Sequence, residues 1–524
     1  MKDILIVNYN AESLLAAAHK LTAFEHPKPL NLQAMYIQCT ERELIIFKKI
    51  AEAAAALQTD CYAIGGFVRD KILGRPTTDI DIVCTGDGIA LAQKVASLFS
   101  PMPVVHVFKT FGTAQIRLLV DEAGNAVETG NKDRPWVEAL DIEFVGARKE
   151  SYSANSRKPA VQAGTLEDDQ NRRDFTINAL AISLNKDTYG QLLDPFNGLQ
   201  HMQDKILKTP LAPDQTFIDD PLRMMRGIRF ASQLHFTLTE ETLASISRNA
   251  ARIRIISQER ITEELNKILL CEKPSIGFDL LYKTGLLQII FPQMVALAGA
   301  EYIDGKGHKD NFYHTLQVVD NIAQHTDDLW LRWAAVLHDI AKPATKRFEE
   351  GHGWTFHGHE VVGGRMVPKI FAQLKLPQNE KQQFVRKMVE LHLRPISLTK
   401  ENITDSAIRR LLFDAGEDLE SLMMLCKSDI TSKNPYKVKR FLENFEMVQQ
   451  LCVELEAKDH IRNWQPPVTG EVIMQAFNLP PSKPVGVLKD AIRNAILDGV
   501  IPNEYNAAIE YMHFKAKEIG LGEG

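Results

Sequence analysis

The sequence contains no apolar run of the roughly 20 residues that a membrane-spanning helix needs, and its first ten residues lack the features of a signal peptide. Cysteine is scarce: six residues are scattered over 524 positions without a CxxC pair, which argues against a disulfide framework and a zinc knuckle. The net charge is −6, so any contact with nucleic acid needs a local basic surface. These absences lead us to expect a cytoplasmic protein with reduced cysteines.

The chain is long enough for several domains. Its hydrophobic pattern changes from alternating strands and helices to helices alone. We therefore expect a mixed α/β head followed by a long all-α body. The predicted regions are an N-terminal extension of unknown role (1–34), the head (35–190), a helical neck (191–300), a histidine-rich helical domain (301–432) and a helical tail (433–524).

The head begins, in this interpretation, with a helix from Met35, which is also an alternative start of the natural chain. The strand CYAI leads to a Gly-Gly turn, the helix RDKIL and the acidic strand DIDIVC. Further strands are predicted near residues 103–109, 112–119 and 139–148. From Asp194 onward the pattern is helical.

Two aspartates, Asp79 and Asp81, stand inside the apolar strand DIDIVC. Strand residues i and i+2 point to the same face, so the two carboxylates project side by side and can hold a pair of Mg²⁺ ions roughly 4 Å apart. Gly65 and Gly66 end the preceding strand, where backbone N–H groups can approach a phosphate, and Arg69 follows one turn into the next helix. Alone, D-x-D is typical of an exposed strand end and Gly-Gly of a turn. Their combination in this order favours a metal-dependent nucleotide site.

A basic ridge is predicted in the neck. Asp220, Arg223, Arg226 and Arg229 recur every three residues in DPLRMMRGIRF, and a helix aligns such residues on one face. An acceptor beside forked donors suits the edge of a nucleobase. The alternative is an exposed charged helix with salt bridges between turns, which the small number of acidic residues opposite the arginines disfavours.

The pattern G-G-x-V-R-D…D-I-D-I resembles the class II nucleotidyltransferases, which include CCA-adding tRNA nucleotidyltransferases, A-adding enzymes and bacterial poly(A) polymerases. The segments RRDFTINALA, DPFNGLQHMQDKILKT, DDPLRMMRGIRF and ERITEEL follow in the order of the family's later motifs. The family usually has Glu-Asp where this chain has Asp219 and Asp220, a change that keeps the charge.

This resemblance implies template-independent addition of CMP and AMP from CTP and ATP to the 3′ end of tRNA by a two-metal mechanism. Asp79 and Asp81 are then the catalytic ligands of Mg²⁺. The residues implied in nucleotide binding are Gly65, Gly66, Arg69, Arg173, Asp220, Arg223, Arg226 and Arg229.

The long polar segment 147–174 matches the position of the family's flexible loop. Its full length favours CCA addition over A-only addition or poly(A) synthesis, because A-adding members have a shortened loop. Asp174 is interpreted as an orienting residue or a helix cap. A third carboxylate, at Glu143 or Asp141, is left open.

Eight of the fifteen histidines lie within residues 308–392. His338 and Asp339 are adjacent on a predicted helix that is otherwise apolar (WAAVLHDIA), with His314 before them and Asp429 after them. Imidazole and carboxylate together suit Mn²⁺, Fe²⁺, Ni²⁺ or Zn²⁺. A single buried histidine is more often a core residue than a ligand, but this ordered set is similar to the metal ligands of HD phosphohydrolases.

The resemblance to HD phosphohydrolases implies hydrolysis of phosphomonoesters or cyclic phosphodiesters at RNA ends, or a domain that only stabilises the fold. His359 and His392 match positions that hold a second metal in some members, although His357 leaves the register open. Lys342 either pairs with a substrate phosphate or caps a helix.

The C-terminal helices resemble the part of the family's enzymes that binds the tRNA elbow. Lys437, Lys439 and Arg440 are either RNA contacts or a solvated surface. The sequence thus predicts a nucleotidyltransferase and, as a second hypothesis, a nucleotide or RNA-end phosphohydrolase that acts through the HD residues. A non-catalytic RNA-binding protein is disfavoured because both metal-binding sets are complete. No membrane partner is expected.

Overall fold

The computed structural model describes residues 5–7, 35–37, 39–121, 123–127, 137–153, 156–303, 306–307, 310–398, 404–432, 434–459 and 464–521. The chain forms two compact units, which are described separately. Unit 1 comprises Met1–Ser257 with Lys283–Leu286, and unit 2 comprises Gln258–Tyr282 with Leu287–Gly524. Apart from residues 5–7, the extension at 1–34 lies outside the described residues. The boundaries of the five regions stay a prediction.

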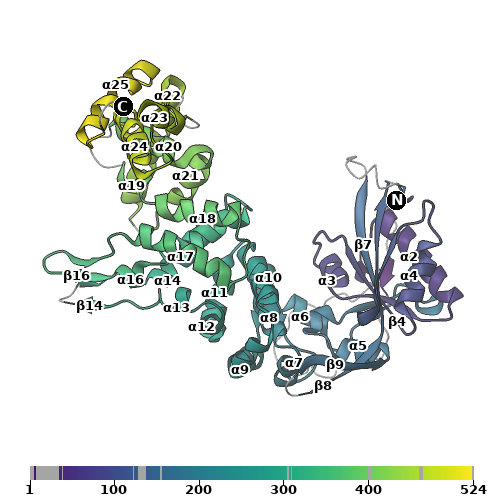
Figure 1. Ribbon diagram of the computed structural model, residues 1–524. Helices are drawn as coiled ribbons and strands as arrows, with labels where there is room; N and C mark the ends of the chain where they lie inside the picture. The colour runs from purple at the N-terminus through teal and green to yellow at the C-terminus, as the bar shows by residue number, and fades with distance from the viewer. Residues whose placement is uncertain are drawn as a thin grey trace. The chain divides into compact units, whose positions relative to one another are not determined.

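Unit 1 is built around a seven-stranded mixed sheet with the order β11-β10-β3-β4-β7-β6-β5 (Figure 1). The central strand β4 (Asp79–Cys84) pairs antiparallel with β3 (Cys61–Ile64) and parallel with β7 (Glu138–Gly146). The other strands of the sheet are β5 (Val105–Phe108), β6 (Thr113–Val120), β10 (Ala181–Ser183) and β11 (Leu192–Leu193). The expected mixed α/β head is confirmed.

One face of this sheet forms the core of unit 1. Helix α4 (Gly88–Ala96) packs against β4, β6 and β7, and helix α2 (Glu41–Ala56) packs against α4. Ile80, Ile82 and Ile142 are buried because successive strand residues alternate between the two faces of a sheet. Burying each such side chain stabilises the fold by about 1.5–3 kcal/mol. The same alternation directs the residues between them to the other face.

The helix predicted from Met35 begins at Glu41, so the expected start is wrong. Thr40 accepts a hydrogen bond from the backbone N–H of Glu43, and the Glu43 carboxylate accepts one from the Thr40 N–H. This capping box satisfies the first free N–H groups of α2 and fixes its start. Residues Met35–Ile37 form strand β2 instead, which pairs with β1 (Leu5–Val7).

The polar segment that was expected to be a flexible loop forms a hairpin. Strands β8 (Arg148–Ser153) and β9 (Ser156–Ala163) pair antiparallel, with a register shift between Ser151 and Ser153, and helix α5 (Leu166–Asn171) follows. Hydrogen bonds between the two strands satisfy their backbone N–H and C=O groups. The polar composition of the segment gave no sign of this pairing.

The rest of unit 1 is mostly helical, but the prediction of helices alone after Asp194 is wrong because β12 (Ile206–Leu207) and β13 (Thr237–Leu238) form a short parallel pair. The helical segments are α3 (Gly66–Ile72), η1 (Lys109–Phe111), η3 (Thr176–Asn178), η4 (Lys186–Thr188), α6 (Gly198–Gln203), α7 (Pro213–Asp219), α8 (Leu222–Leu234), α9 (Glu240–Asn249) and η5 (Ala250–Ile255).

Unit 2 confirms the helical body. Two short hairpins also occur in it: β14 (Tyr302–Ile303) with β15 (Lys306–Gly307), and β16 (Arg347–Glu349) with β17 (Gly353–Thr355). Its first helices are α10 (Gln258–Leu269), α11 (Pro274–Lys283), α12 (Leu286–Ile290) and α13 (Pro292–Val295).

The histidine-rich domain is a cluster of packed helices in unit 2. Its elements are α14 (Asn311–Ala323), α15 (Leu329–Leu337), α16 (Lys342–Thr345), α17 (His359–Gln373), α18 (Glu380–Leu391), α19 (Arg394–Ser397), α20 (Asp405–Ala415), η6 (Gly416–Asp418) and α21 (Leu419–Ser428). Helix α15 packs against α14, α18 and α21, so residues far apart in sequence meet around its C-terminal end.

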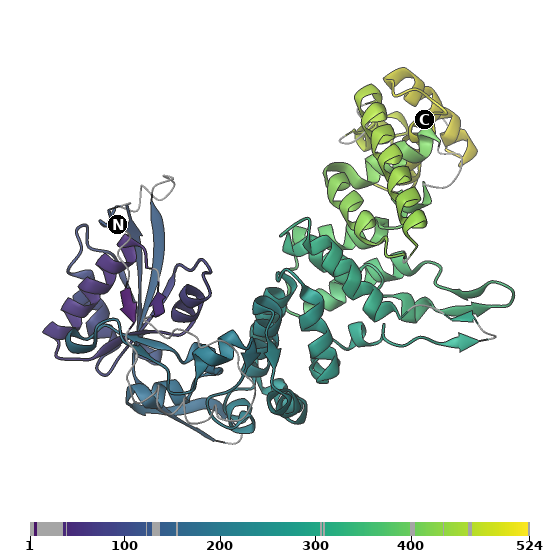
Figure 2. The same cartoon turned by 180° about the vertical axis from the view of Figure 1, so that it is seen from behind.

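The tail contains α22 (Pro435–Asp459), α23 (Gly470–Ala476), α24 (Lys483–Leu497) and α25 (Tyr505–Glu518), drawn in yellow-green and yellow in Figure 2. Buried Ile473, Leu488, Ile492 and Met512 form a hydrophobic core shared by α23, α24 and α25. Among the described residues, no helix has the length and apolar character needed to cross a membrane.

Candidate active site and metal centre

The acidic residues of the head lie on the sheet face opposite the buried isoleucines. Strand alternation places Asp79 and Asp81 on the same face of β4. The parallel register with β7 sets Asp141 beside Asp79 and Glu143 beside Asp81. Four carboxylates therefore lie on one face of two adjacent strands, and the register places Glu143 next to Asp81. The sequence analysis left the third carboxylate open between Glu143 and Asp141 because both lie on one face of the same strand. The register of two strands about 60 residues apart is not visible in local spacing.

The electrostatics of this acidic face favour a bound cation. Burial raises the pKa of Asp81, the Arg173 charge opposes this, and the neighbouring Asp79 raises it further. Burial also raises the pKa of Glu143, and Asp81 adds to the effect. Ionised carboxylates that repel one another in a partly buried site gain most from a divalent cation, which neutralises them and replaces lost hydration.

Gly65 brings the turn after β3 into contact with this site. It precedes α3, its φ is +81°, and a Cβ atom built on it would lie 2.7 Å from Arg173 Nη1 and 3.0 Å from Asp81 Oδ2. Glycine is therefore required both for the backbone conformation and for the close approach. Gly66 begins α3 directly after this turn. The structure thus brings together Gly65, Arg173 and Asp81, which the sequence analysis had named separately.

Arg173 is held in place by Asp169, a residue that the sequence analysis missed. Asp169 is fully buried, and its carboxylate accepts hydrogen bonds from Arg172 and, at 3.1 Å, from Arg173 Nε. Burial acts to raise the pKa of Asp169, but the two guanidinium groups hold it below its ordinary value. Arg172 and Arg173 lie three and four residues after Asp169, and this spacing in the sequence would have indicated the ion pairs on a helix.

A buried hydrogen-bond network links α3, η3 and α8. Asp174 Oδ2 accepts from Arg226 Nε at 2.6 Å, and Asp174 Oδ1 accepts from Asn178 Nδ2 at 2.9 Å. Asn178 Oδ1 in turn accepts from Arg69 Nη1 at 2.7 Å, and Arg69 also pairs with Asp70. Burial acts to raise the pKa of Asp174, but Arg226 and Asn178 hold it well below its ordinary value. Asp174 is thus placed to orient its neighbours.

Three arginines surround the ring of Phe230. The guanidinium carbons of Arg69, Arg226 and Arg229 lie 4.9, 5.5 and 4.3 Å from the ring centroid. Such cation–π contacts fix flat guanidinium groups without removing their charge. Arg69 is only 6% exposed, so it holds its neighbours in the network in place.

The predicted ridge from Asp220 to Arg229 is wrong at its first member. Asp220 follows α7 in an extended conformation, and Pro221 precedes the first residue of α8. Asp220 Oδ1 accepts from the Leu222 N–H at 3.1 Å, and Arg223 lies buried within α8. Proline explains the difference, because the residue before a proline is disfavoured in the helical conformation.

The histidines of unit 2 meet in the interior as expected for metal ligands. Nδ1 of His338, His359 and His392 donates to the carbonyl oxygen three residues earlier, at 2.8, 2.8 and 2.7 Å. A carbonyl only accepts, so each ring carries a proton on Nδ1, and Nε2 is the nitrogen that faces the site and is available to a metal ion. All three Nε2 atoms are buried without a hydrogen-bond partner. This donor set fits metal coordination better than a satisfied core.

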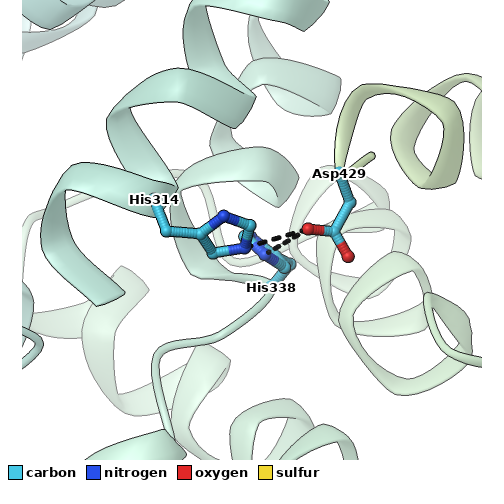
Figure 3. Close-up of side chains that lie close together, drawn as sticks. All are labelled: His314, His338 and Asp429. Atoms are coloured by element: carbon cyan, nitrogen blue, oxygen red, sulfur yellow. Dashed lines mark ion pairs between the residues drawn. The ribbon is translucent and has the colours of Figure 1, made fainter. Parts of the chain in front are cut away.

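The first group of candidate ligands is His314, His338 and Asp429 (Figure 3). His314 Nε2 lies 2.9 Å and His338 Nε2 lies 3.6 Å from Asp429 Oδ1. His338 caps the C-terminal end of α15, and Asp339 follows it outside the helix, so the expectation that both lie within one helix is wrong. The helix end turns the two adjacent side chains toward the same point.

Asp339 also serves a second group, with His359 and His392. Its Oδ2 lies 3.2 Å from His338 Nε2, whereas its Oδ1 lies 3.2 Å from His359 Nε2 and 3.9 Å from His392 Nε2. One carboxylate thus faces both groups. His357 is exposed, which places His359 in the site and resolves the register.

The pKa values of the histidines in this site show where a positive charge is stabilised. Burial acts to lower the pKa of His338, but Asp339 and Asp429 raise it to about 10. Burial and the nearby His338 lower the pKa of His392 to about 4. Lys342 Nζ lies 2.6 Å from Asp339 Oδ2, so the structure pairs this lysine with a ligand carboxylate. A cation at the converging oxygens replaces the proton and satisfies the buried nitrogens.

Three family models match successive parts of the chain. They are the Poly A polymerase head domain at residues 61–208, the probable RNA and SrmB- binding site of polymerase A at 235–297, and the HD domain at 311–429. The fold and the two sites define a nucleotidyltransferase head joined to a helical body with an HD domain. Both kinds of domain use divalent metal ions.

The relatives agree with these models. An A-adding tRNA nucleotidyltransferase of Halalkalibacterium halodurans is 35% identical over 59% of this chain and 67% of its own. A multifunctional CCA protein of Pseudomonas syringae is 31% identical over 61% of this chain and 71% of its own. The chain belongs to the tRNA nucleotidyltransferase and poly(A) polymerase family, as the resemblance predicted. The crystal structure of the Bacillus stearothermophilus CCA-adding enzyme in complex with CTP has the same fold, with a TM-score of 0.59 at 23% identity over 90% of this chain and 97% of that one.

Proposed function

We propose that the head adds CMP and AMP from CTP and ATP to the 3′ end of tRNA without a template. The observation that carries this proposal is the acidic face of β4 and β7 next to the Gly65 turn and Arg173. The names of the relatives, which add A or CCA to tRNA, support the choice of substrate. We expect Mg²⁺ as the metal, because oxygen-only ligands suit this hard cation.

The reaction joins the RNA 3′-oxygen to the α-phosphorus of the nucleotide, breaks the bond to the β-phosphate and releases pyrophosphate. Asp79 and Asp81, with Glu143 beside them, would hold the divalent cations that stabilise the developing phosphate charge. The first N–H groups of α3, directly after the Gly65 turn, and the Arg173 guanidinium would face the triphosphate. Asp169 keeps Arg173 in place.

Base selection is assigned to the start of α8. Asp220 and Arg223 remain the proposed readers of the incoming base, with an acceptor and a forked donor for its edge. Arg226 and Arg229 are proposed to brace this reader through Asp174 and Phe230. The full-length segment 147–174 favours CCA addition. A-only addition and poly(A) synthesis are the alternatives.

The decisive experiment supplies tRNA that ends in the discriminator base, in C, or in CC, and sequences the extended ends. The proposal expects additions of CCA, CA and A, respectively. An A-adding enzyme extends only the CC end, and a poly(A) polymerase adds runs of A to all three. A tRNA that already ends in CCA is the control and stays unextended. If all three incomplete substrates remain unchanged, the proposal is wrong.

Replacing Gly65 with alanine tests the close approach at the head. We expect kcat for nucleotide incorporation to fall about 10²-fold, because the added methyl group displaces Arg173 and Asp81 from their positions. The matched control is Gly74→Ala: Gly74 has a φ of +67° but no atom within 4 Å of a built Cβ. Both variants are expected to lose about 1 kcal/mol of stability from the strained backbone. An equal loss of kcat in both variants would contradict the assigned role.

We propose a second activity for the HD domain, the hydrolysis of phosphomonoesters or cyclic phosphodiesters at RNA ends or on nucleotides. Three buried and unpartnered Nε2 atoms, directed toward shared carboxylates, support this hypothesis. Their nitrogen and oxygen donors suit Mn²⁺, Fe²⁺, Ni²⁺ or Zn²⁺. A bound metal would supply a Lewis acid and an activated water. The cytoplasmic location stays a prediction.

A further inference from the structure

The acidic face of the unit 1 sheet continues past its carboxylates to β5, the last strand of the sheet. The registers set Glu143 beside Asp81, Gln115 opposite Glu143, and His106 opposite Gln115. Directly paired residues share one face, so these side chains form a row across four strands. Phe108 lies two residues after His106 on β5 and projects from this same face.

Two aromatic side chains stand exposed past the end of this row, one on β5 two residues after His106 and one in the turn that follows β5. Phe108 is 46% exposed, and Phe111, in the following turn η1, is 68% exposed. Arg148 Nη1 donates to the carbonyl oxygen of Phe111 at 3.3 Å. Arg148 begins β8 two residues after the end of β7, the strand that carries Glu143. Exposed aromatic rings beside a catalytic site are typical of a ligand-binding surface.

The geometry of the transfer reaction indicates which substrate lies next to this surface. Gly65 follows β3, on one side of β4, whereas Glu143 lies on β7, on the other side. In an in-line displacement the attacking hydroxyl and the leaving pyrophosphate lie on opposite sides of the phosphorus. A triphosphate at the Gly65 turn therefore leaves the β7, β6 and β5 side to the RNA 3′ end.

The distances agree with this direction. Neighbouring strands lie roughly 4.8 Å apart, and Phe108 is in register with Val145, two residues along β7 from Glu143. Phe108 is therefore about 12 Å from Glu143. Bases stack roughly 3.4 Å apart. A single-stranded 3′ end of about three or four stacked bases is therefore long enough to extend from Glu143 to Phe108.

We propose that Phe108 and Phe111 form a stacking platform for the last unpaired bases of the RNA 3′ end, with exposed Lys109 and Arg117 beside the RNA backbone. The inference rests on the proposed transfer of nucleotides to tRNA. Stacking suits this task because every base offers a π-face. The terminal base changes at each step of CCA addition, so a platform that reads no base edge accepts all the intermediates.

The test uses the full chain with Phe108→Ala, Phe111→Ala and both together. Stacking contributes about 1–3 kcal/mol per base, so we expect the KM for tRNA lacking CCA to rise about 10- to 100-fold in the double variant. The KM for CTP and kcat at saturating tRNA are expected to stay within about twofold of the wild type. The KM for tRNA is expected to stay near the wild-type value in Phe108→Tyr and to rise in Phe108→Leu as it does in Phe108→Ala, because only an aromatic ring stacks on a base.

Leu57→Ala is the matched control, since Leu57 is an apolar side chain of the same unit with a similar exposure of 41%. The second readout is the fluorescence of 2-aminopurine at the RNA 3′ end, titrated with protein without nucleotide. Wild type is expected to quench it and the double variant is not. Equal quenching by both, or an equal rise in KM for Leu57→Ala, overturns the platform. A wild type that quenches but extends no tRNA contradicts the proposed function and leaves the platform standing.

Discussion

Replacing Asp81 with asparagine is expected to reduce incorporation of labelled CTP and ATP into tRNA lacking CCA by at least about 10³-fold. The amide keeps the shape of the side chain but removes the charge that holds the cations, whose contribution to catalysis is several kcal/mol. Asp79→Ala is expected to have an effect of the same order, because both side chains share one face of β4. The measurement is single-turnover incorporation with Mg²⁺ at saturating nucleotide.

Stability separates loss of catalysis from loss of folding in this variant. Burial raises the folded-state pKa of Asp81 above its unfolded value, so the ionised form costs stability, and this cost appears as pH rises through the folded pKa. Asp81→Asn should therefore melt at the same temperature as the wild type, or higher, at pH 7 without Mg²⁺. Mg²⁺ should stabilise the wild type more than the variant.

Asp187→Asn, at an exposed position in η4, is the matched control and should retain full incorporation. Normal incorporation by Asp81→Asn or Asp79→Ala would remove the two-metal hypothesis. Loss of activity with an equal loss of melting temperature would show only that the site is needed for folding.

Replacing His338 or Asp339 with alanine is expected to lower the rate of phosphate release from RNA-end phosphates about 10²-fold or more. The assay is run with Mn²⁺, Fe²⁺, Ni²⁺ and Zn²⁺ in turn. Asp339 faces both groups of histidines, so its loss should lower the bound metal content in both. His359→Ala removes a ligand of the second group only. The measurements are phosphate release and metal content by elemental analysis.

His357→Ala is the matched control, because His357 is exposed and lies only two residues from His359. It should retain metal and phosphate release. Incorporation of CTP and ATP should survive all these changes, since the head and the HD domain belong to different compact units. Phosphate release that persists without His338 and Asp339 would contradict the hydrolase hypothesis, and the absence of release by wild type with every metal would leave the domain a structural role.

The sequence alone determined the residues whose relation is local. Strand alternation is enough to place Asp79 and Asp81 on one face, and a Gly-Gly pair between a strand and a helix is enough to indicate a tight turn. The order of the histidines and aspartates also indicated a metal centre. The first two conclusions needed only spacing within one element. The metal centre was inferred from the order and chemistry of residues between 314 and 429 and from their similarity to HD phosphohydrolases.

Contacts between distant segments were decided only by the tertiary structure. The register of β4 and β7 places Glu143 beside Asp81, and Pro221 separates Asp220 from α8. The fold buries His359, with its Nε2 3.2 Å from Asp339 Oδ1, and leaves His357 exposed. It also places Asp339 between the two groups of candidate ligands. Such contacts depend on which elements pack together and in which register, and the free energy that selects them comes from burial across the whole core rather than from neighbouring residues.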